Sequence, residues 1–244
     1  MAAKLPRIKS LQDLIVYEDE TIILVNKPLQ MASLADKGNL HLQALAKAYD
    51  ENLMLCHRLD KNTSGILLMA RNPEAYRNIA IQFEKRQVSK TYLTLAGGVH
   101  HFDNHLIDLP LYVSTNKRVV VSKQQGKPSQ TKVTAEEQFK HATLLRCEPI
   151  TGRMHQIRVH LAAIHCPIIG DQLYGGKDLF LSKLKKNYQH SSRREEQPIN
   201  HGFLLHAHQL QFTHPQTGEA FIQQAELPKN FATTMKILRK YDAR

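Results

Sequence analysis

A nonapeptide near residue 60 holds the side chains best suited to chemistry. It reads His57-Arg58-Leu59-Asp60-Lys61-Asn62-Thr63-Ser64-Gly65 and combines cations, hydroxyls and one carboxylate. Asp60 is the only carboxylate between Glu51 and Glu74 in the sequence, and cations stand on both sides of it. Positive charge and loop hydrogen-bond donors favour an ionised carboxylate, so the spacing is compatible with a reactive aspartate. An ordinary turn, in which Asp60 and Ser64 bond to the backbone, fits the same residues and is favoured by periodicity alone.

Apolar runs on both sides of this loop predict the elements that would position it. Residues 53–56 precede the loop and residues 66–70 follow it. Runs of four or five apolar residues that end at a polar, glycine-containing turn are typical of buried strands, and rigid strands hold a functional loop in place. We therefore expect the nonapeptide to connect two strands.

Strand patterns outnumber helical patterns in the rest of the chain. Short or alternating apolar runs predict strands at residues 14–28, 88–96, 107–111, 118–122, 133–148 and on both sides of the turn at 214–218. Helical spacing predicts helices at 40–49, 73–86, 154–165 with Thr151 or Gly152 as cap, and at the C-terminus with Phe231, Met235 and Leu238 on one face. These patterns predict an α+β protein with a largely antiparallel, mixed central sheet and flanking helices.

The nonapeptide resembles the signature loop of the RluA-type RNA pseudouridine synthases, His-Arg-Leu-Asp-x-x-Thr-Ser-Gly. Further blocks similar to that family follow in its order: Lys90-x-Tyr92, Thr151 to His160, Pro167 to Gly175, and Leu205-His-Ala207 with His214-Pro-x-Thr-Gly218. Five ordered blocks are a specific signal, and the resemblance covers roughly residues 14–228. One departure is Gln30, which stands where the family usually has glycine, so the turn there is expected to differ.

This resemblance implies both a fold and a reaction. The fold is a pseudouridine synthase-like bent sheet in two subdomains around an RNA-binding cleft. The reaction isomerises a specific uridine of structured RNA, either rRNA or tRNA, and it needs no cofactor and no metal. Asp60 would be the nucleophile at C1′ or, in the competing scheme, the base that removes the C2′ proton. Tyr92 would stack on the target base, and a role in proton transfer is the open alternative.

The same resemblance implies roles for other side chains. Arg158 would be the third catalytic residue, an ion-pair partner that orients the aspartate and keeps it ionised. Ile157 would pack on the target base from the side opposite the tyrosine. Arg58 would fill the place that the base leaves when it flips out of its helix. His57 and Lys90, from the same blocks, are expected to complete the substrate-binding residues.

Composition favours a folded protein with a polyanionic partner. The chain has 33 Lys and Arg against 22 Asp and Glu, a net charge of +11. Charge alone does not separate RNA from DNA or from an acidic membrane. No run approaches the roughly 20 apolar residues that span a bilayer, and no signal peptide pattern is present, so the expected location is the cytoplasm. Nothing in the sequence implies an obligate protein partner, and a monomer is expected.

The chain is expected to hold one catalytic domain. Residues 1–13 form a polar lead-in, and 14–244 are expected to be that domain, without the S4-type RNA-binding domain that the family often carries. Residues 177–201 form a basic insertion with six cations against three acids, and this insertion is expected to be flexible. We interpret this insertion as an RNA contact at the rim of the cleft. A solvated loop without a role is the alternative.

Other functions are less well supported. A catalytically silent RNA-binding protein or RNA chaperone would keep the fold and charge, but it would not need the three catalytic residues. A metal-dependent nuclease is disfavoured because the matched blocks supply one carboxylate where two-metal sites need several. His155, His160 and His165 recur every five residues. A helix turns that spacing through about 140° per step, so these histidines are poor joint ligands.

Overall fold

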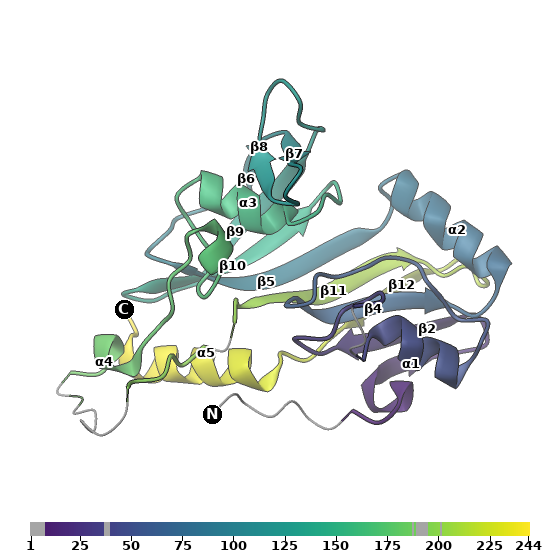
Figure 1. Cartoon of the computed structure of the whole chain (residues 1–244), viewed down its shortest axis with the longest axis horizontal. Coiled ribbons are helices and arrows are strands. Elements are labelled where there is room, and N and C mark those ends of the chain that lie inside the picture. The colour runs from purple at the N-terminus through teal and green to yellow at the C-terminus, as the bar shows by residue number, and fades with distance from the viewer. Residues whose placement is uncertain (1–7, 37–39, 187, 189–194, 201) are drawn as a thin grey trace. The chain divides into compact units, whose positions relative to one another are not determined.

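The computed structural model describes residues 8–36, 40–186, 188, 195–200 and 202–244 (Figure 1). The chain folds into two compact units. Unit 1 holds residues 1–91 and 206–228, and unit 2 holds residues 92–205 and 229–244. The chain leaves unit 1 within β5 (Ser89–Gly97) and returns within β11 (Leu205–Thr213). Each unit is therefore built from distant parts of the sequence.

Unit 1 is a sheet with β4 at its centre. Its strands follow the order β1 (Ile15–Glu18), β2 (Ile22–Lys27), β4 (Ser64–Ala70) and β11, with β3 (Met54–Leu55) on β4 and β12 (Ala220–Gln224) on β11. The β4 strand pairs antiparallel with β2 and β3 and parallel with β11. All seven residues of β4 are buried, which explains its continuous apolar sequence.

The helices of unit 1 are α1 (Leu42–Tyr49) and α2 (Pro73–Glu84), and a short 3-10 helix (Leu11–Leu14) precedes β1. The start of α2 is the one predicted: the Asn72 side chain accepts a hydrogen bond of 2.8 Å from Ala75 N, and Pro73 occupies the first turn. Its buried Ile79 packs into the core of the unit with residues of β2, β4 and β11. The helical spacing read from residues 73–86 is confirmed.

Unit 2 contains an antiparallel sheet in the order β5, β10 (Ala142–Pro149), β9 (Gln130–Gln138) and β6 (His105–Asp108). A separate ribbon pairs β7 (Leu111–Val113) with β8 (Val119–Val121). The helices are α3 (Gln156–Ala163), α4 (Leu181–Leu184) and α5 (Lys229–Tyr241), with a 3-10 turn, η2, at Gln172–Tyr174. In Figure 1 the ribbon lies beside α3, and Leu111, Val119 and Val159 form a small buried cluster there.

The predicted fold class is confirmed. The sheets are mostly antiparallel, and the β4–β11 ladder makes them mixed. The amphipathic C-terminal helix also buries the expected Phe231, Met235 and Leu238. The predicted cap of α3 is wrong: His155 occupies the N-cap position with a left-handed φ of 53°. Thr151 is used elsewhere, because its hydroxyl accepts from Gln130 N at 3.0 Å and donates to the Gln156 side chain at 2.7 Å.

The basic insertion contains structured elements in its described part. Leu179 and Leu184 are buried, and the Asn200 side chain accepts a hydrogen bond of 2.8 Å from Leu179 N. Residues 187, 189–194 and 201 lie outside the described residues, and so do two of the six cations, Arg193 and Arg194. The prediction of a mobile RNA contact at residues 177–201 stays a prediction.

Candidate active site

Residues 57–63 of the nonapeptide lie in the loop between β3 and β4, as predicted, and Ser64 and Gly65 begin β4. Leu59 and Thr63 are buried, whereas Arg58 is exposed and Asp60 is half-buried. The loop closes on itself through a 3.0 Å hydrogen bond from Thr63 N to the Asp60 carbonyl. It therefore anchors its apolar and hydroxyl residues and leaves the side chains of Arg58 and Asp60 accessible.

Ser33 holds the residue before the aspartate. Its buried hydroxyl donates to the Leu59 carbonyl at 2.8 Å and accepts from Leu59 N at 3.0 Å. One side chain thus satisfies both backbone polar groups of a residue that would otherwise be buried without partners. The backbone that leads into Asp60 has a defined place because of this double contact.

Lys27 holds the residue after the aspartate. Its side chain is fully buried, and Nζ donates to the carbonyls of Pro28 at 3.0 Å, Met31 at 2.8 Å and Lys61 at 3.3 Å. Burial lowers the pKa of Lys27 to about 7, and the negative charge of Asp60 opposes that shift. In its protonated form, Lys27 therefore stabilises both the backbone of the loop and the Asp60 carboxylate.

His57 fixes the beginning of the loop to β4. Its Nε2 accepts a hydrogen bond of 3.0 Å from Leu68 N, and its ring lies 5.1 Å from the Phe83 ring, measured between centroids. Burial and the positive charge of Lys90 lower the pKa of His57 to about 3, so the ring is neutral near pH 7 and can accept. Burial, followed by the charge of Arg86, also lowers the pKa of Lys90.

His206 fixes the end of the loop. Ser64 Oγ and His206 Nδ1 are 2.9 Å apart, and His206 Nε2 lies 3.3 Å from the Ala225 carbonyl. A carbonyl can only accept, so Nε2 carries the proton and Nδ1 accepts from the serine. Burial lowers the pKa of His206 to about 4, which keeps this pattern in place near pH 7. The Leu205-His-Ala207 block thus supports the signature loop.

In unit 2, Tyr92 and Ile157 belong to one apolar assembly. Tyr92 lies on β5 opposite Cys147 of β10 and is half-buried. It packs against the buried cluster that contains Cys147 and Ile157, and Ile157 is the second residue of α3. The structure therefore brings these two predicted substrate contacts into one apolar cluster.

Arg158 is buried, so it points inward as expected and is not a surface arginine. Its Nε and Nη2 donate to the two carboxylate oxygens of Asp171 at 2.7 and 2.8 Å. The rings of Tyr174 and Phe203 lie 4.8 and 4.3 Å from its guanidinium carbon. This arrangement holds the guanidinium plane in one orientation.

The predicted site residues divide between the units. His57, Arg58, Asp60 and Lys90 lie in unit 1, and Tyr92, Ile157 and Arg158 lie in unit 2. Pairing of Arg158 with Asp60 stays a prediction, as does the catalytic role of Asp60. Sequence reasoning gave no role to five supporting residues, which are Lys27, Ser33, Asp171, Tyr174 and His206. Three of them, Asp171, Tyr174 and His206, lie in family-like blocks that could have indicated a role, whereas the contacts of Lys27 and Ser33 are visible only in the folded chain.

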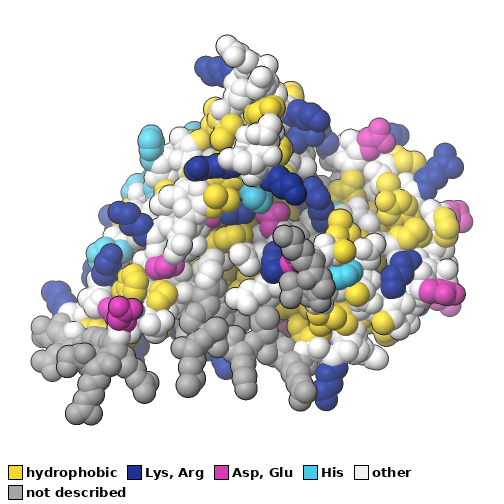
Figure 2. All heavy atoms as spheres, in the orientation of Figure 1, with side chains coloured by type: hydrophobic (Ala, Val, Ile, Leu, Met, Phe, Trp, Pro, Cys, Tyr) yellow, Lys and Arg dark blue, Asp and Glu magenta, His cyan; other side chains and the backbone are white. Residues whose placement is uncertain are grey.

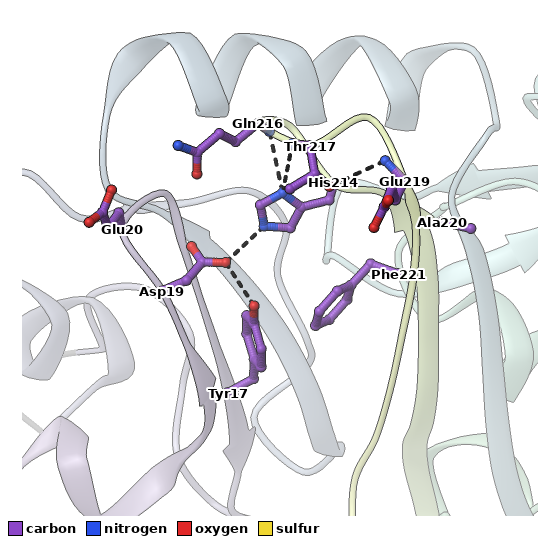
Figure 3. A pocket seen from close by; sticks show the side chains of 9 residues that line it. All are labelled: Tyr17, Asp19, Glu20, His214, Gln216, Thr217, Glu219, Ala220 and Phe221. Atoms are coloured by element: carbon purple, nitrogen blue, oxygen red, sulfur yellow. Dashed lines mark hydrogen bonds and ion pairs between the residues drawn. The ribbon is translucent and has the colours of Figure 1, made fainter.

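A concave pocket of unit 1 is a different feature (Figure 3). It has a volume of about 410 Å³, and its lining includes Tyr17, Asp19, Glu20, His214 and Glu219. Asp19 accepts five hydrogen bonds, from the following turn and from the Tyr17 and His214 side chains. The acidic lining opposes phosphate, and the Asp19 carboxylate is already saturated. The hydrogen bonds of Asp19 therefore join its own turn to the turn that begins at His214. We do not regard this pocket as a candidate site for RNA chemistry.

The chain is similar in sequence to known proteins over most of its length. A sequence profile described as RNA pseudouridylate synthase matches residues 21–163. The chain is 35% identical to the ribosomal large subunit pseudouridine synthase C of Salmonella typhi over 96% of its own length and 73% of that protein. It is 34% identical to the protein of that name from Escherichia coli, with the same coverage.

Solved structures agree with this likeness. Human RNA pseudouridylate synthase domain containing 4 matches with a TM-score of 0.73 and 27% identity over 94% of each chain. Human RNA pseudouridylate synthase domain containing 1 matches with a TM-score of 0.68 and 25% identity over 98% of this chain and all of that one. Among the described residues, no helix has both the length and the apolar character to cross a membrane.

Proposed function

Because the chain belongs to the RNA pseudouridylate synthase family, and is thus an isomerase that acts on uridine in RNA, we propose that its substrate is ribosomal RNA of the large subunit. The names of the bacterial relatives support this choice over tRNA. We further propose that the protein acts as a monomer in the cytoplasm, without cofactor or metal.

The anchoring of the Asp60 loop carries the catalytic assignment. Ser33 holds Leu59, Lys27 holds the Lys61 carbonyl, and the Asp60 side chain itself is partly accessible between them. A catalytic group needs a defined position, since small misplacements cost large factors in rate. We infer that Asp60 is the reactive carboxylate.

The reaction conserves all atoms of the nucleoside. The N1–C1′ bond breaks, the uracil turns over, a C5–C1′ bond forms, and the proton from C5 is released while N1 gains one. Asp60 either attacks C1′ and forms an ester that is later displaced, or removes the C2′ proton to give a glycal. Both routes need the carboxylate and no redox change.

The remaining predicted residues have complementary roles. We propose that Tyr92 stacks on the target uracil and that Ile157 contacts its other face, in keeping with their shared apolar cluster. Arg158 would orient the carboxylate. Arg58 is exposed in the loop, where it could take the place of the flipped base. His57 and Lys90 would support substrate contacts at the same loop.

Surface charge supports binding of an RNA backbone. Figure 2 shows Lys and Arg side chains gathered over β7, β8 and α3 of unit 2. Five exposed cations belong to this part of the chain: Lys117, Arg118, Lys123, Lys127 and Arg153. With a net charge of +11, binding should weaken as salt displaces phosphate contacts.

A tritium-release assay tests the proposal. Large-subunit rRNA that carries 5-³H-uridine is incubated with the protein in EDTA, and the modified position is mapped. We expect release by the wild type, no release by Asp60→Asn, and RNA affinity within a few-fold, because the substitution keeps volume and removes the charge. Asp50→Asn, which changes an aspartate of unit 1 outside the loop, is the matched control.

Each negative result has a distinct meaning. Turnover by purified Asp60→Asn would remove the catalytic assignment. Release from tRNA but not from large-subunit rRNA would keep the chemistry and overturn the proposed substrate. Activity that disappears in EDTA and returns with Mg²⁺ would overturn the proposed independence from metal.

A further inference from the structure

Arg158 has more contacts than a simple ion pair with Asp171 would need. The side chains of Arg158 and Asp171 are 7% and 2% exposed, and they form two parallel hydrogen bonds. The guanidinium has five N–H groups, and the two bonds to Asp171 use one on Nε and one on Nη2. The other three therefore point away from Asp171, so this carboxylate sets the direction in which Arg158 can donate.

Asp171 is itself held by the backbone. Its N–H donates to the Ile168 carbonyl at 3.0 Å, and its carbonyl accepts from Tyr174 N at 3.0 Å and Gly176 N at 2.9 Å. The turn is so tight that a Cβ on Gly176 would lie 1.8 Å from the Ile168 carbonyl oxygen. The Asp171 side chain consequently starts from a backbone with little freedom.

Tyr174 fixes the guanidinium plane from one face. Its hydroxyl accepts from Val119 N at 3.3 Å and lies 2.7 Å from His155 Nδ1, so the hydroxyl proton is available to that nitrogen. Val119 belongs to β8, and His155 caps α3. The ring that stacks on Arg158 is thus attached both to the ribbon and to the start of the helix that carries the arginine.

Stability alone does not account for this arrangement. Removal of two charges from water costs several kcal/mol, and well-packed apolar residues often give equal or greater stability than a buried ion pair. An arginine that makes two hydrogen bonds to one carboxylate and also contacts aromatic rings has its remaining N–H donors held in a fixed direction. The Pro167 to Gly175 block supplies both Asp171 and Tyr174, together with the buried Ile168 that precedes them.

We propose that Asp171 and Tyr174 are positioning residues that act through Arg158: the carboxylate sets the direction of the guanidinium and the tyrosine sets its plane. The inference rests on the proposed function, because it assumes that Arg158 takes part in the uridine reaction. Neither Asp171 nor Tyr174 needs to contact the substrate for this role.

A double-mutant cycle tests the dependence on Arg158. Single-turnover rates at saturating RNA are compared for Asp171→Asn, Tyr174→Phe, Arg158→Met and the two double variants that contain Arg158→Met. We expect Asp171→Asn to lower the rate by roughly tenfold or more, and Tyr174→Phe by a smaller factor, with RNA affinity within about threefold. Each double variant should be no slower than Arg158→Met alone, whereas losses that multiply would overturn the proposal.

Matched controls separate positioning from general damage. Asp242→Asn removes another buried carboxylate of unit 2, which bonds His141, and Tyr241→Phe removes a hydroxyl from α5. We expect both controls to turn over RNA at the wild-type rate. If Asp242→Asn slows the reaction as much as Asp171→Asn does, the loss is structural and the proposal fails.

Arginine side-chain NMR provides a readout that does not depend on activity. In the wild type, Arg158 should give separate signals for its two Nη groups because rotation about Nε–Cζ is hindered, and the signals are assigned by their absence in Arg158→Met. They should merge in Asp171→Asn and persist in Asp242→Asn. Merged signals in the wild type would overturn the positioning. Resolved signals in an inactive wild type would instead overturn the proposed function alone.

Discussion

Gly65 lies against Ala207 at a distance that no other residue type could keep. A Cβ on residue 65 would be 2.1 Å from the Ala207 carbonyl oxygen, and Gly65 has a φ of +115°. The two residues face each other in the parallel ladder between β4 and β11. The last residue of the signature loop and the last residue of the Leu205-His-Ala207 block are therefore parts of one contact.

Gly65→Ala should disrupt this contact. The obstacle is a backbone oxygen, which cannot rotate away, so the β4–β11 ladder must open or shift. We expect the free energy of unfolding to fall by more than about 3 kcal/mol, in the range of severe backbone and packing changes, with loss of activity. Gly97→Ala is the control, because a Cβ there meets nothing within 4 Å. Equal stability of the two variants in urea titrations would contradict the argument.

Ser33→Ala should remove the two hydrogen bonds that hold Leu59, the residue before Asp60. The variant leaves the N–H and carbonyl of buried Leu59 without the serine, so we expect a loss of about 1–3 kcal/mol in the free energy of unfolding. The rate on saturating RNA should fall by about tenfold to a hundredfold, since Asp60 loses a neighbour of defined position. RNA affinity should change little because Ser33 is buried. A normal rate with reduced stability would make Ser33 purely structural.

Gln30 supplies a smaller test. It has a φ of 62°, a left-handed conformation in which glycine is less strained than glutamine. Gln30→Gly should therefore raise the free energy of unfolding by roughly 0.5 kcal/mol, the relief of strain exceeding the greater entropy of the unfolded glycine chain. Gln30→Val should lower it, because a branched side chain is strained further. Thermal unfolding of the three proteins measures both changes, and a stabilising valine would refute the explanation.

Sequence patterns predicted an element correctly where its structure depends on burial or capping within a few neighbouring residues. The continuous apolar run of β4, the Asn72 cap of α2 and the buried face of α5 were all predicted, because burial and capping act over a few residues. The cap of α3 was missed since His155 adopts a left-handed conformation that its residue type does not signal. Likewise, Ser33 and Lys27 reach the Asp60 loop only after folding, so no local spacing could reveal them.

The hydrogen bonds to the Asp19 carboxylate predict that the free energy of unfolding depends on pH. Burial alone would raise the pKa of this carboxyl, but hydrogen bonds from Ile22 N, Thr21 N and the His214 and Tyr17 side chains outweigh burial and lower it to about 2. Asp19 therefore stabilises the fold above about pH 4, and this contribution is lost as pH falls from about 4 to 2. After allowance for partial exposure, the contribution is about 1–2 kcal/mol.

Asp19→Asn gives the corresponding measurement. Near pH 7 the variant should be less stable than the wild type by that amount, and the difference should shrink between about pH 4 and pH 2. Glu20→Gln, a change of the adjacent exposed carboxylate, controls for loss of one negative charge. A stability difference that stays constant down to pH 2 would show that the carboxylate charge is not the source.

Tyr92 decides between two chemical roles. If its ring only stacks on the uracil, Tyr92→Phe should retain the rate and Tyr92→Leu should lose it. If its hydroxyl also transfers a proton, both variants should lose roughly a hundredfold or more in single-turnover rate, as is usual for a general acid–base group. The half-buried position on β5 beside the Ile157 cluster suits stacking, so we expect the first pattern. Equal losses in the two variants would assign the proton transfer to the tyrosine.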